Sequence, residues 1–229
     1  MKKVLKFILL LIGIVFGLLL IVRFTKVFQY YKAPTIANEP SIELNSGMLG
    51  TKFITPERLD FIWFMGETPF GRQLNVYRLC GLPGDIVEIK NGVLFVNNEN
   101  IDKDLKLSHN YILTQNEFEN IRSLLHVRKD FIIKLSADSL SVPLADDFAK
   151  ENNLQGKRQV CLQSFKDPAI NKVFNKDWNS DNFGPVKVPD DAYFVLGDNR
   201  HNASDSRYKG FIDRSDFSST VFWREEQAY

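Results

Sequence analysis

The chain has 229 residues, of which 44% are apolar and 13% aromatic, so it can bury the core of one or two domains and is not a disordered chain. Its 29 lysines and arginines nearly balance 28 aspartates and glutamates, which excludes a strongly charged nucleic-acid-binding protein. The two cysteines, Cys80 and Cys161, lack metal-ligand spacing and are too few for a disulfide framework, so we expect no metal or cofactor. Two buried thiols and a single disulfide both fit this count.

Residues 1–26 are the most apolar part of the chain. The stretch from Phe7 to Val22 is uncharged and apolar throughout. With Val4 and Leu5 it would form about 28 Å of helix, close to the roughly 30 Å hydrocarbon core of a membrane. No small-residue cleavage site follows it, so we expect an uncleaved membrane anchor. Lysines and arginines flank the run on both sides, so charge alone does not set its orientation.

The remaining chain divides by composition. Residues 27–41 contain two prolines and no clear period, which is typical of a juxtamembrane linker. Residues 42–101 alternate short apolar runs with turn signals such as "GLPGD" and "KNG", as antiparallel hairpins do. Residues 102–183 are more polar and predict an inserted β-rich subdomain with short helices, and residues 184–229 complete the core. The predicted fold is mainly β, an antiparallel core with this insert, preceded by one transmembrane helix.

The most specific stretch is "LGDNRHNASDSRYKGFI", residues 196–212. A strand-like run leads into a turn of short polar residues, and then Asp205 and Arg207 place a carboxylate and a guanidinium two residues apart. Alone, this pattern indicates only a turn with a local ion pair. The exact string, G-D-N-R followed by D-S-R-x-x-G, resembles the C-terminal signature of the bacterial type I signal peptidases, membrane-bound serine endopeptidases that use a Ser/Lys dyad.

A second stretch agrees with this resemblance. "VYRLCGLPGDIVEIKNGVLFVNN", residues 76–98, contains a tight G-x-P-G-D turn and a hairpin. It is similar to the family's central motif, in which a lysine and an arginine precede that turn. The N-terminal anchor and the "GPVKVP" segment at residues 184–189 match as well, so the resemblance covers essentially the whole chain. It implies a framework made of Met48, Arg78, Gly81, Pro83, Gly84, Asp85, Gly197, Asp198, Asn199, Arg200, Asp205, Ser206 and Arg207.

The resemblance also implies the positions of the dyad. The family's first motif is similar to S-x-S-M-x-P-T, whose second serine is the nucleophile, and "NSGMLGT" at residues 45–51 supplies a methionine and a threonine in that register. This register puts Gly47 at the nucleophile, and a glycine cannot form an acyl-enzyme. The base lysine corresponds to Tyr77, a poor base with an unperturbed pKa near 10. The serine that orients the lysine corresponds to Ala203. We expect Tyr77 to fill the lysine's space close to Gly47.

A relocated active site is the alternative. Ser46 is the fallback nucleophile, but a step of one residue along a strand turns a side chain to the opposite face. The three histidines, His109, His126 and His201, raise the possibility of a catalytic Ser/His pair. The sequence, however, places no serine next to any of them.

The resemblance therefore implies a signal peptidase-like protein in which both dyad positions are substituted. The leading hypothesis is a catalytically inactive member that binds extended precursor segments in protein secretion or pilus assembly. The alternative hypotheses are an active signal peptidase with a non-standard nucleophile and a purely structural subunit. The family's topology implies a single-pass protein of the bacterial cytoplasmic membrane with its N-terminus inside and its body outside. The short anchor is similar to Gram-positive forms. The expected partners are membrane lipid and secreted or pilin-like precursors.

Overall fold

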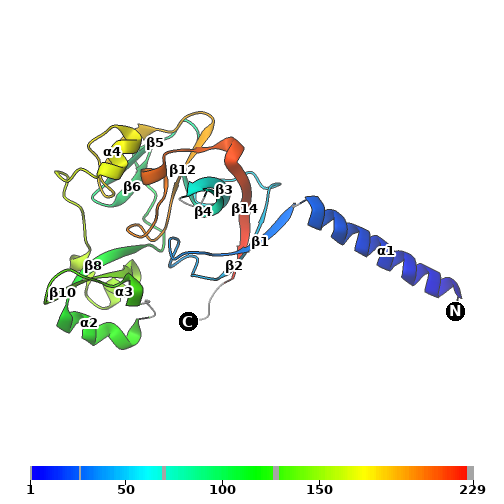
Figure 1. Ribbon diagram of the computed structural model, residues 1–229, viewed down its shortest axis with the longest axis horizontal. Coiled ribbons are helices and arrows are strands. Elements are labelled where there is room, and N and C mark those ends of the chain that lie inside the picture. The colour runs from blue at the N-terminus through cyan, green and yellow to red at the C-terminus, as the bar shows by residue number, and fades with distance from the viewer. Residues whose placement is uncertain (1, 26, 69–70, 126–128, 226–229) are drawn as a thin grey trace.

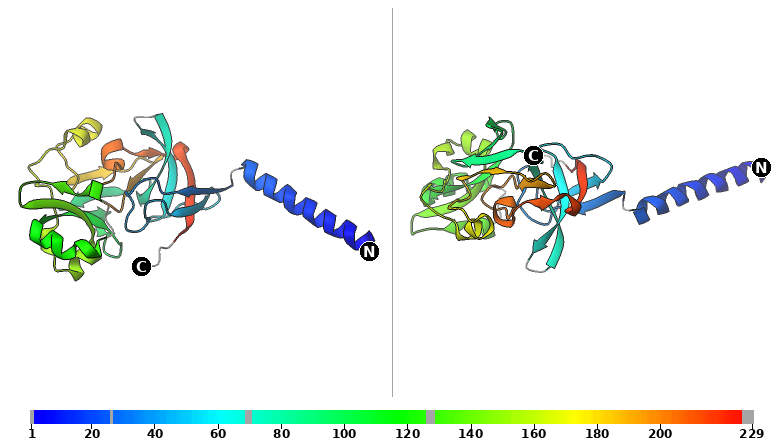
Figure 2. Two further views of the ribbon diagram at one scale, coloured as in Figure 1. Left: turned by 60° about the horizontal axis from the view of Figure 1, so that its bottom comes forward. Right: turned by 90° about the horizontal axis from the view of Figure 1, so that it is seen from above.

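The computed structural model describes residues 2–25, 27–68, 71–125 and 129–225. The chain begins with one long helix, α1 (Lys2–Thr25), which extends away from a body built mostly of strands (Figure 1). In both views of Figure 2, α1 leaves the body at the end opposite to the green elements. Within the described residues, no helix combines the length and the apolar character that crossing a membrane requires.

The largest unit is a seven-stranded antiparallel sheet in the order β1-β2-β14-β3-β4-β12-β13. Its two faces bury different side chains, because residues alternate along each strand. One face carries Met48, Phe61, Trp63 and Val76, and the other carries Ile62, Phe64, Leu79 and Val195. The strands are β1 (Phe28–Lys32), β2 (Gly47–Thr51), β3 (Phe61–Thr68), β4 (Gly71–Gly81), β12 (Ala192–Leu196), β13 (Ile212–Asp213) and β14 (Phe217–Arg224).

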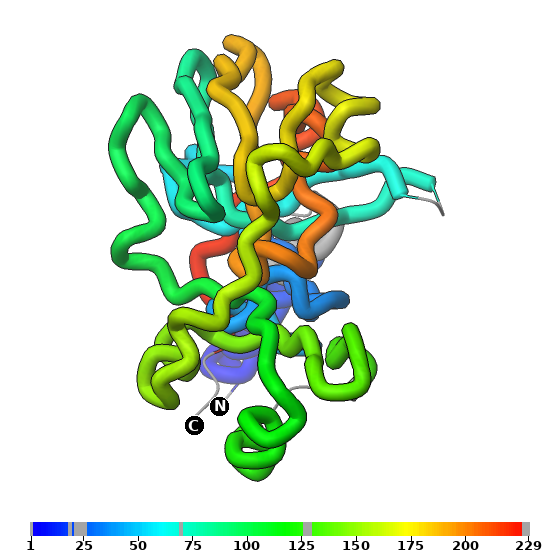
Figure 3. Tube along the Cα trace, turned by 90° about the vertical axis from the view of Figure 1, so that its left-hand side faces the viewer, coloured from blue at the N-terminus to red at the C-terminus, as the bar shows by residue number. Residues whose placement is uncertain are grey.

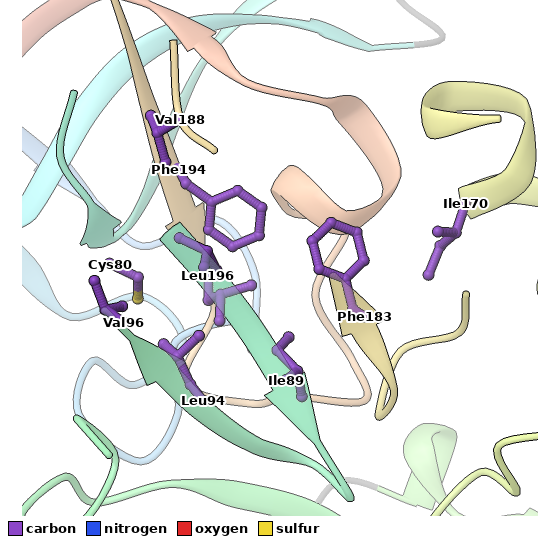
Figure 4. Close-up of a cluster of buried hydrophobic side chains, with 10 residues drawn as sticks. Cys80, Ile89, Leu94, Val96, Ile170, Phe183, Val188, Phe194 and Leu196 are labelled. Carbon is purple, nitrogen blue, oxygen red and sulfur yellow. The ribbon is translucent and has the colours of Figure 1, made fainter. Parts of the chain in front are cut away.

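A four-stranded sheet in the order β11-β5-β6-β7 packs beside the first. Its strands are β5 (Ile86–Lys90), β6 (Val93–Val96), β7 (Glu99–Asn100) and β11 (Phe183–Lys187). Asn91 and Gly92 turn the β5–β6 hairpin with positive φ, as an Asn-Gly turn of this kind requires. Figure 4 shows the shared core, in which side chains of this sheet meet β4, β12 and the helix α4 (Pro168–Phe174): Cys80, Val87, Ile89, Leu94, Val96, Ile170, Phe183, Val188, Phe194 and Leu196.

The third sheet, β8-β10-β9, lies within the predicted insert. Figure 3 shows the strands and helices of residues 108–157 gathered on one side of the other two sheets. Thr114 begins α2 with a capping box in which its hydroxyl and the Glu117 carboxylate each bond the other's backbone amide. The elements are β8 (Ser108–Thr114), α2 (Gln115–Ile121), β9 (Ile133–Lys134), β10 (Ser139–Ala145) and α3 (Asp146–Glu151), with 3-10 turns at Arg122–Leu124, Lys129–Phe131 and Gln155–Lys157.

Three short elements complete the body: α4 (Pro168–Phe174), α5 (Ser206–Lys209) and a 3-10 turn at Arg214–Asp216. The mainly β, antiparallel class predicted from the sequence is confirmed. The domain boundaries stay predictions, and residues 1, 26 and 226–229 of the predicted anchor and core lie outside the described part of the chain. Cys80 and Cys161 are both free thiols, so no disulfide joins them; Cys80 is buried as expected, whereas Cys161 is only half-buried.

Candidate functional site

The candidate site is organised around residues 197–207, here called the wall segment, which follows β12. This polar segment is largely buried because its charges are paired, Asp205 with Arg207 inside the segment and the others with residues of the core. Asp205 accepts hydrogen bonds from Arg207 at 2.9 and 2.8 Å and from the amide of Gly197 at 3.1 Å. Both side chains of the Asp205–Arg207 pair are almost completely buried. The Ser206 hydroxyl accepts from the amide of Val195 at 2.9 Å, which fastens the segment to β12.

Two further ion pairs join the wall segment to the rest of the core. In β4, the Arg78 Nε donates to Asp198 at 2.7 Å, and a second nitrogen of the same guanidinium donates to the carbonyl of Leu59. The Arg200 guanidinium donates to Asp102 at 2.7 Å, across a separation of 98 residues in the chain. These pairs are buried, so removing one partner of any of them would leave an uncompensated charge.

The G-x-P-G-D turn that follows β4 is held by Asp85. Its carboxylate accepts from the amide of Leu82 at 2.6 Å, from Arg58 at 2.7 Å and from the side chain of Asn97 at 2.8 Å. Gly84 has a φ of 84°, a conformation that a side chain would strain. Of the predicted framework, Gly81, Pro83, Gly84 and Asp85 therefore shape a structural turn.

Tyr77 lies on β4 beside the wall segment. It is half-buried and lines a cleft of about 560 Å³ together with Ser204 and Asp205. Burial, and then the nearby Asp205 carboxylate, raise the pKa of the Tyr77 phenol above its ordinary value, against a hydrogen bond with the backbone of Ser204. The phenol is therefore neutral at physiological pH and cannot take a proton from a nucleophile.

Ala203 lies against a residue that the sequence analysis did not single out. A β-carbon at Gly197 would be 2.4 Å from both the β-carbon of Ala203 and the carbonyl oxygen of Ala37. That same carbonyl accepts a hydrogen bond from the amide of Asn199 at 3.0 Å. The next side chain, Asn38, donates to the carbonyl of Val76 at 2.9 Å. Ala37 is therefore enclosed between the wall segment and the part of β4 that carries Tyr77.

Gly47 has different surroundings. A β-carbon at Gly47 would be 2.5 Å from the phenol oxygen of Tyr30, and its amide donates to Glu225 at 3.0 Å. Along the sheet, β14 and β3 separate β2 from β4, which is about 14 Å at roughly 4.8 Å per strand. The expected proximity of Gly47 and Tyr77 is thus not observed, because the pairing of β2 with β14 puts Gly47 near the edge of the sheet.

The sequence contained a signal for Ala37. The pattern S-x-S-M-x-P-T fits "TIANEPS", residues 35–41, at its proline and at both outer hydroxyl positions, and the register places Ala37 at the nucleophile. The reading at residues 45–51 kept the methionine and threonine but had no proline. The proline favours the register at residues 35–41, since a proline restricts the backbone of the turn that carries the motif.

Ser46 and the histidines do not form an alternative site within the described residues. Ser46 is 1% exposed and its hydroxyl has no hydrogen-bond partner there, so neither substrate nor base reaches it. His109 bonds Asp146 through Nδ1 at 2.9 Å, and His201 bonds Asp181 through Nε2 at 3.1 Å. His126 lies outside the described residues.

The cleft beside Tyr77 lies between the β3–β4 hairpin and residues 204–216. Its floor is apolar and includes Phe64, Val195 and Ile212, while an Arg72–Asp216 ion pair and Lys209 lie at its rim. No cluster of three or more metal-binding side chains occurs in the described parts of the chain. The cleft can hold an extended chain with apolar side chains, but its lining brings no activated nucleophile.

Comparisons with known proteins find similar sequences along most of the chain. A sequence profile described as "Signal peptidase, peptidase S26" matches residues 1–224. The chain is 26% identical to signal peptidase I S of Bacillus subtilis over 76% of its own length and 60% of that protein's. It is 30% identical to signal peptidase I of Buchnera aphidicola subsp. Baizongia pistaciae over 73% of its own length and 54% of that protein's. The chain thus spans less than two thirds of these relatives.

A solved structure, a signal peptidase I from Enterococcus faecalis, is 20% identical to the chain and has a TM-score of 0.36. The match covers 73% of this chain and 97% of the solved one.

The buried Asp205–Arg207 pair predicts a large stability difference between neighbouring substitutions. Asp205→Ala should lower the free energy of unfolding by about 3–5 kcal/mol, because Arg207 is left as an unpaired buried charge. Ser204→Ala is the matched control: Ser204 is exposed, so the loss should stay within about 0.5 kcal/mol. Urea unfolding followed by circular dichroism measures both. Equal, negligible losses would show that the wall segment is not a structural brace.

The burial of His109 predicts that the folded protein loses stability in acid. Burial lowers its pKa below the ordinary value, although Asp146 opposes the shift, and the Arg200 and His201 side chains add to the lowering. The unfolded chain therefore binds a proton more readily than the folded one, so stability should fall as pH drops below about 6.5. His109→Gln should flatten this dependence between pH 7 and 5 in urea unfolding. An unchanged slope would assign the acid sensitivity to other groups.

Proposed function

Because the chain belongs to the signal peptidase family, peptidase S26, we propose that it binds extended precursor segments at a membrane without cleaving them. The observation that carries this proposal is the meeting of Ala37, Tyr77 and Ala203 at one place. In the motif register at residues 35–41, these are the positions of the nucleophile, the base and the residue that orients the base. None of the three side chains can act as a nucleophile, take its proton or orient a lysine. The three substitutions therefore point to the same loss of catalysis.

Acyl transfer to an enzyme requires a hydroxyl or thiol and a group that takes its proton. Ala37 offers a methyl group, and Tyr77 offers a neutral phenol whose pKa is raised by burial. The intact framework of Arg78, Asp198 and Asp205 keeps the shape of the site but supplies no base, since all three charges are engaged in ion pairs.

Binding of an extended segment is supported by the edge of β4. This strand pairs with β3 along Gly71–Arg78, but with β12 only from Arg78 to Gly81. Among the described residues, the edge of β4 before Arg78 therefore has no strand partner on the side of β12. The carbonyl of Val76 on this edge accepts a hydrogen bond from the side chain of Asn38. An extended peptide can add to such an edge through its main chain while its side chains enter the adjacent cleft.

Membrane association is supported by α1. Large apolar side chains are exposed along the helix, such as Phe7 at 64% and Leu10 at 62%. Exposed apolar area of this extent is unfavourable in water and favourable in lipid. We propose that α1 holds the chain at the bacterial cytoplasmic membrane with the body on the extracytoplasmic face, as in the family's topology. There it would meet secreted precursors or pilin-like surface subunits.

This proposal predicts binding of a precursor without turnover. The full chain in lipid vesicles, mixed with a signal-bearing precursor, should retain the precursor in a pull-down but release no product above the rate without protein. Ser46→Ala should behave like the wild type, because Ser46 is buried. Specific cleavage by the wild type would contradict the proposal, and its loss in Ser46→Ala would identify the active alternative with a relocated nucleophile.

A set of variants tests which register of the motif, residues 35–41 or 45–51, is correct. The triple variant Ala37→Ser, Tyr77→Lys, Ala203→Ser should cleave the precursor about 10²-fold or more above the wild-type background, the usual size of a general-base contribution. The matched control replaces Ala37→Ser with Gly47→Ser and should remain inactive. Cleavage by the control alone would return the nucleophile position to Gly47.

A further inference from the structure

The start of β8 lies against the wall segment. Ser108 forms a parallel bridge with Asn199 and is hydrogen-bonded to the backbone on both sides of it. Two residues further along β8, the amide of Asn110 donates to Nδ1 of His201 at 3.0 Å. We call this connection between the predicted insert and the wall segment the joint, and it consists of residues 108–110 and 199–202.

Two histidine rings lie inside the joint, and the proposed function uses neither of them. The rings of His109 and His201 meet edge-on, with 5.4 Å between their centroids and 73° between their planes. His109 is 1% exposed, and the side chain of His201 is 8% exposed. Histidine is the side chain that ordinarily changes its charge near neutral pH. The charge of these two rings therefore bears on whether the joint stays closed.

The hydrogen bonds of His201 require a neutral ring. A backbone amide can only donate, so Nδ1 of His201 must accept the amide of Asn110 and carries no proton. The proton is on Nε2, which donates to Asp181 at 3.1 Å. A proton added to Nδ1 would remove the acceptor and set two N–H groups against each other. This connection between the wall segment and β8 would then be lost.

The surroundings of His109 favour a neutral ring as well. Its Nδ1 lies 2.9 and 3.0 Å from the two oxygens of Asp146, and a carboxylate only accepts, so Nδ1 carries the proton. Nε2 is then unprotonated, and it is buried with no hydrogen-bond partner among the described residues. A proton on Nε2 would be a buried donor without an acceptor. Burial accordingly lowers the pKa of His109, against the opposing effect of Asp146.

The titratable and charged groups that face the two rings lie on both sides of the joint. They are Asp146 with the Tyr111 hydroxyl bonded to it, Arg200 with its partner Asp102, and Asp181 with the nearby Arg207. The carboxylates of Asp146 and Asp181 favour a charge on the ring that each one bonds, whereas Arg200 opposes a charge on His109. Two charged rings at this separation would also repel each other. Separating the rings into water relieves the repulsion, so added protons favour an open joint.

The joint is connected to the loop that carries Ala37. Asn199 donates its amide to the carbonyl of Ala37 at 3.0 Å and its side chain to the carbonyl of Ile36 at 3.3 Å. Asn38, the next residue of the loop, bonds the edge of β4 at which an extended segment is proposed to add. Opening the joint therefore loosens one side of the proposed binding site.

We propose that the joint is an acid-sensitive latch, in which protonation of His201 and His109 releases β8 from the wall segment and loosens the loop at residues 35–41. The latch is closed at neutral pH and opens as the pH falls below about 6.5, where a histidine in water becomes charged. A precursor segment that is held at neutral pH would be released in acid. The opening follows from the histidine geometry, whereas the release of a precursor rests on the proposed function.

Histidine ring spectra of the full chain in detergent test the closed state without any variant. Long-range proton–nitrogen NMR spectra distinguish the two neutral tautomers from the charged ring. At pH 7, His201 should carry its proton on Nε2, and His109 should carry its proton on Nδ1. A charged His201, or a neutral one with its proton on Nδ1, would overturn the latch.

Hydrogen exchange of the same sample, corrected for the pH dependence of the chemical exchange rate, measures the opening. From pH 6.5 to 5, peptides that cover the joint should lose protection by up to about tenfold per pH unit for each proton taken up. The β5–β6 hairpin, residues 86–96, should keep its protection. An equal loss in the hairpin would mean global unfolding and would overturn the latch, as would unchanged protection in the joint.

A variant without the titrating ring gives the matched comparison. His201→Gln offers an acceptor to the amide of Asn110 and a donor to Asp181, but it takes up no proton in this pH range. It should reduce the acid-induced loss of protection by about tenfold per pH unit. His126→Gln leaves both histidines of the joint in place and should behave like the wild type. An unchanged loss in His201→Gln would overturn the latch.

Retention of a signal-bearing precursor in a pull-down separates this inference from the proposed function. Retention at pH 7 and release at pH 5.5, with less release in His201→Gln, would support both. Equal retention at the two pH values would overturn the latch alone. No retention at either pH, with a joint that still opens in acid, would contradict the proposed function and leave the opening of the joint supported.

Discussion

The buried Asp205–Arg207 pair is the interaction on which the rest of the site depends. Both side chains are almost completely removed from water, and such a pair is favourable only when further hydrogen bonds satisfy each charge. The Asp205 carboxylate also accepts hydrogen bonds from the backbone amides of Gly197 and Arg207, and the Arg207 guanidinium also donates to the carbonyl of Ser180. The two ends of the wall segment are thereby drawn together, which fixes the positions of Ala203 and of the Asn199 amide that meets Ala37.

This arrangement explains how the framework would persist under the proposed loss of catalysis. The wall segment, the G-x-P-G-D turn and Arg78 are held by ion pairs and by hydrogen bonds to the backbone, and all of them contribute to the stability of the core. The positions proposed to have lost their chemistry are occupied by small or neutral side chains, Ala37, Tyr77 and Ala203. Losing a nucleophile or a base costs no folding energy, whereas losing one partner of a buried ion pair does.

Much of the fold followed from the sequence because its determinants are local. The antiparallel hairpins and the Asn91-Gly92 turn need only alternation and turn residues, and they are present. The ion pair of Asp205 and Arg207 was also expected, as part of a turn, and in the structure Asp205 caps α5, so a helix start sets the pair.

The positions in the candidate site that were missed depend on contacts between distant residues. Ala37 lies in a turn before β2, and its carbonyl, which accepts the amide of Asn199, places it beside the wall segment; the motif pattern at residues 35–41 alone does not show this contact. Gly47 was interpreted as a missing side chain, but its surroundings depend on the pairing of β1 with β2, which no local pattern encodes. The Arg200–Asp102 pair joins residues 98 positions apart and has no sequence signature.

Backbone hydrogen bonds connect the predicted insert to the site. The amide of Ser108, the first residue of β8, donates to the carbonyl of Asp198, and the carbonyl of Ser108 accepts from the amide of Arg200. The start of β8 is therefore hydrogen-bonded to the middle of the wall segment. Asn110 of the same strand is bonded by His201 and Asn202. Amide groups that share such a ladder exchange with solvent together, since one cannot open without the other. The start of β8 and the loop around Ala37 are therefore expected to open together, and a partner that binds residues 108–157 would also restrain that loop.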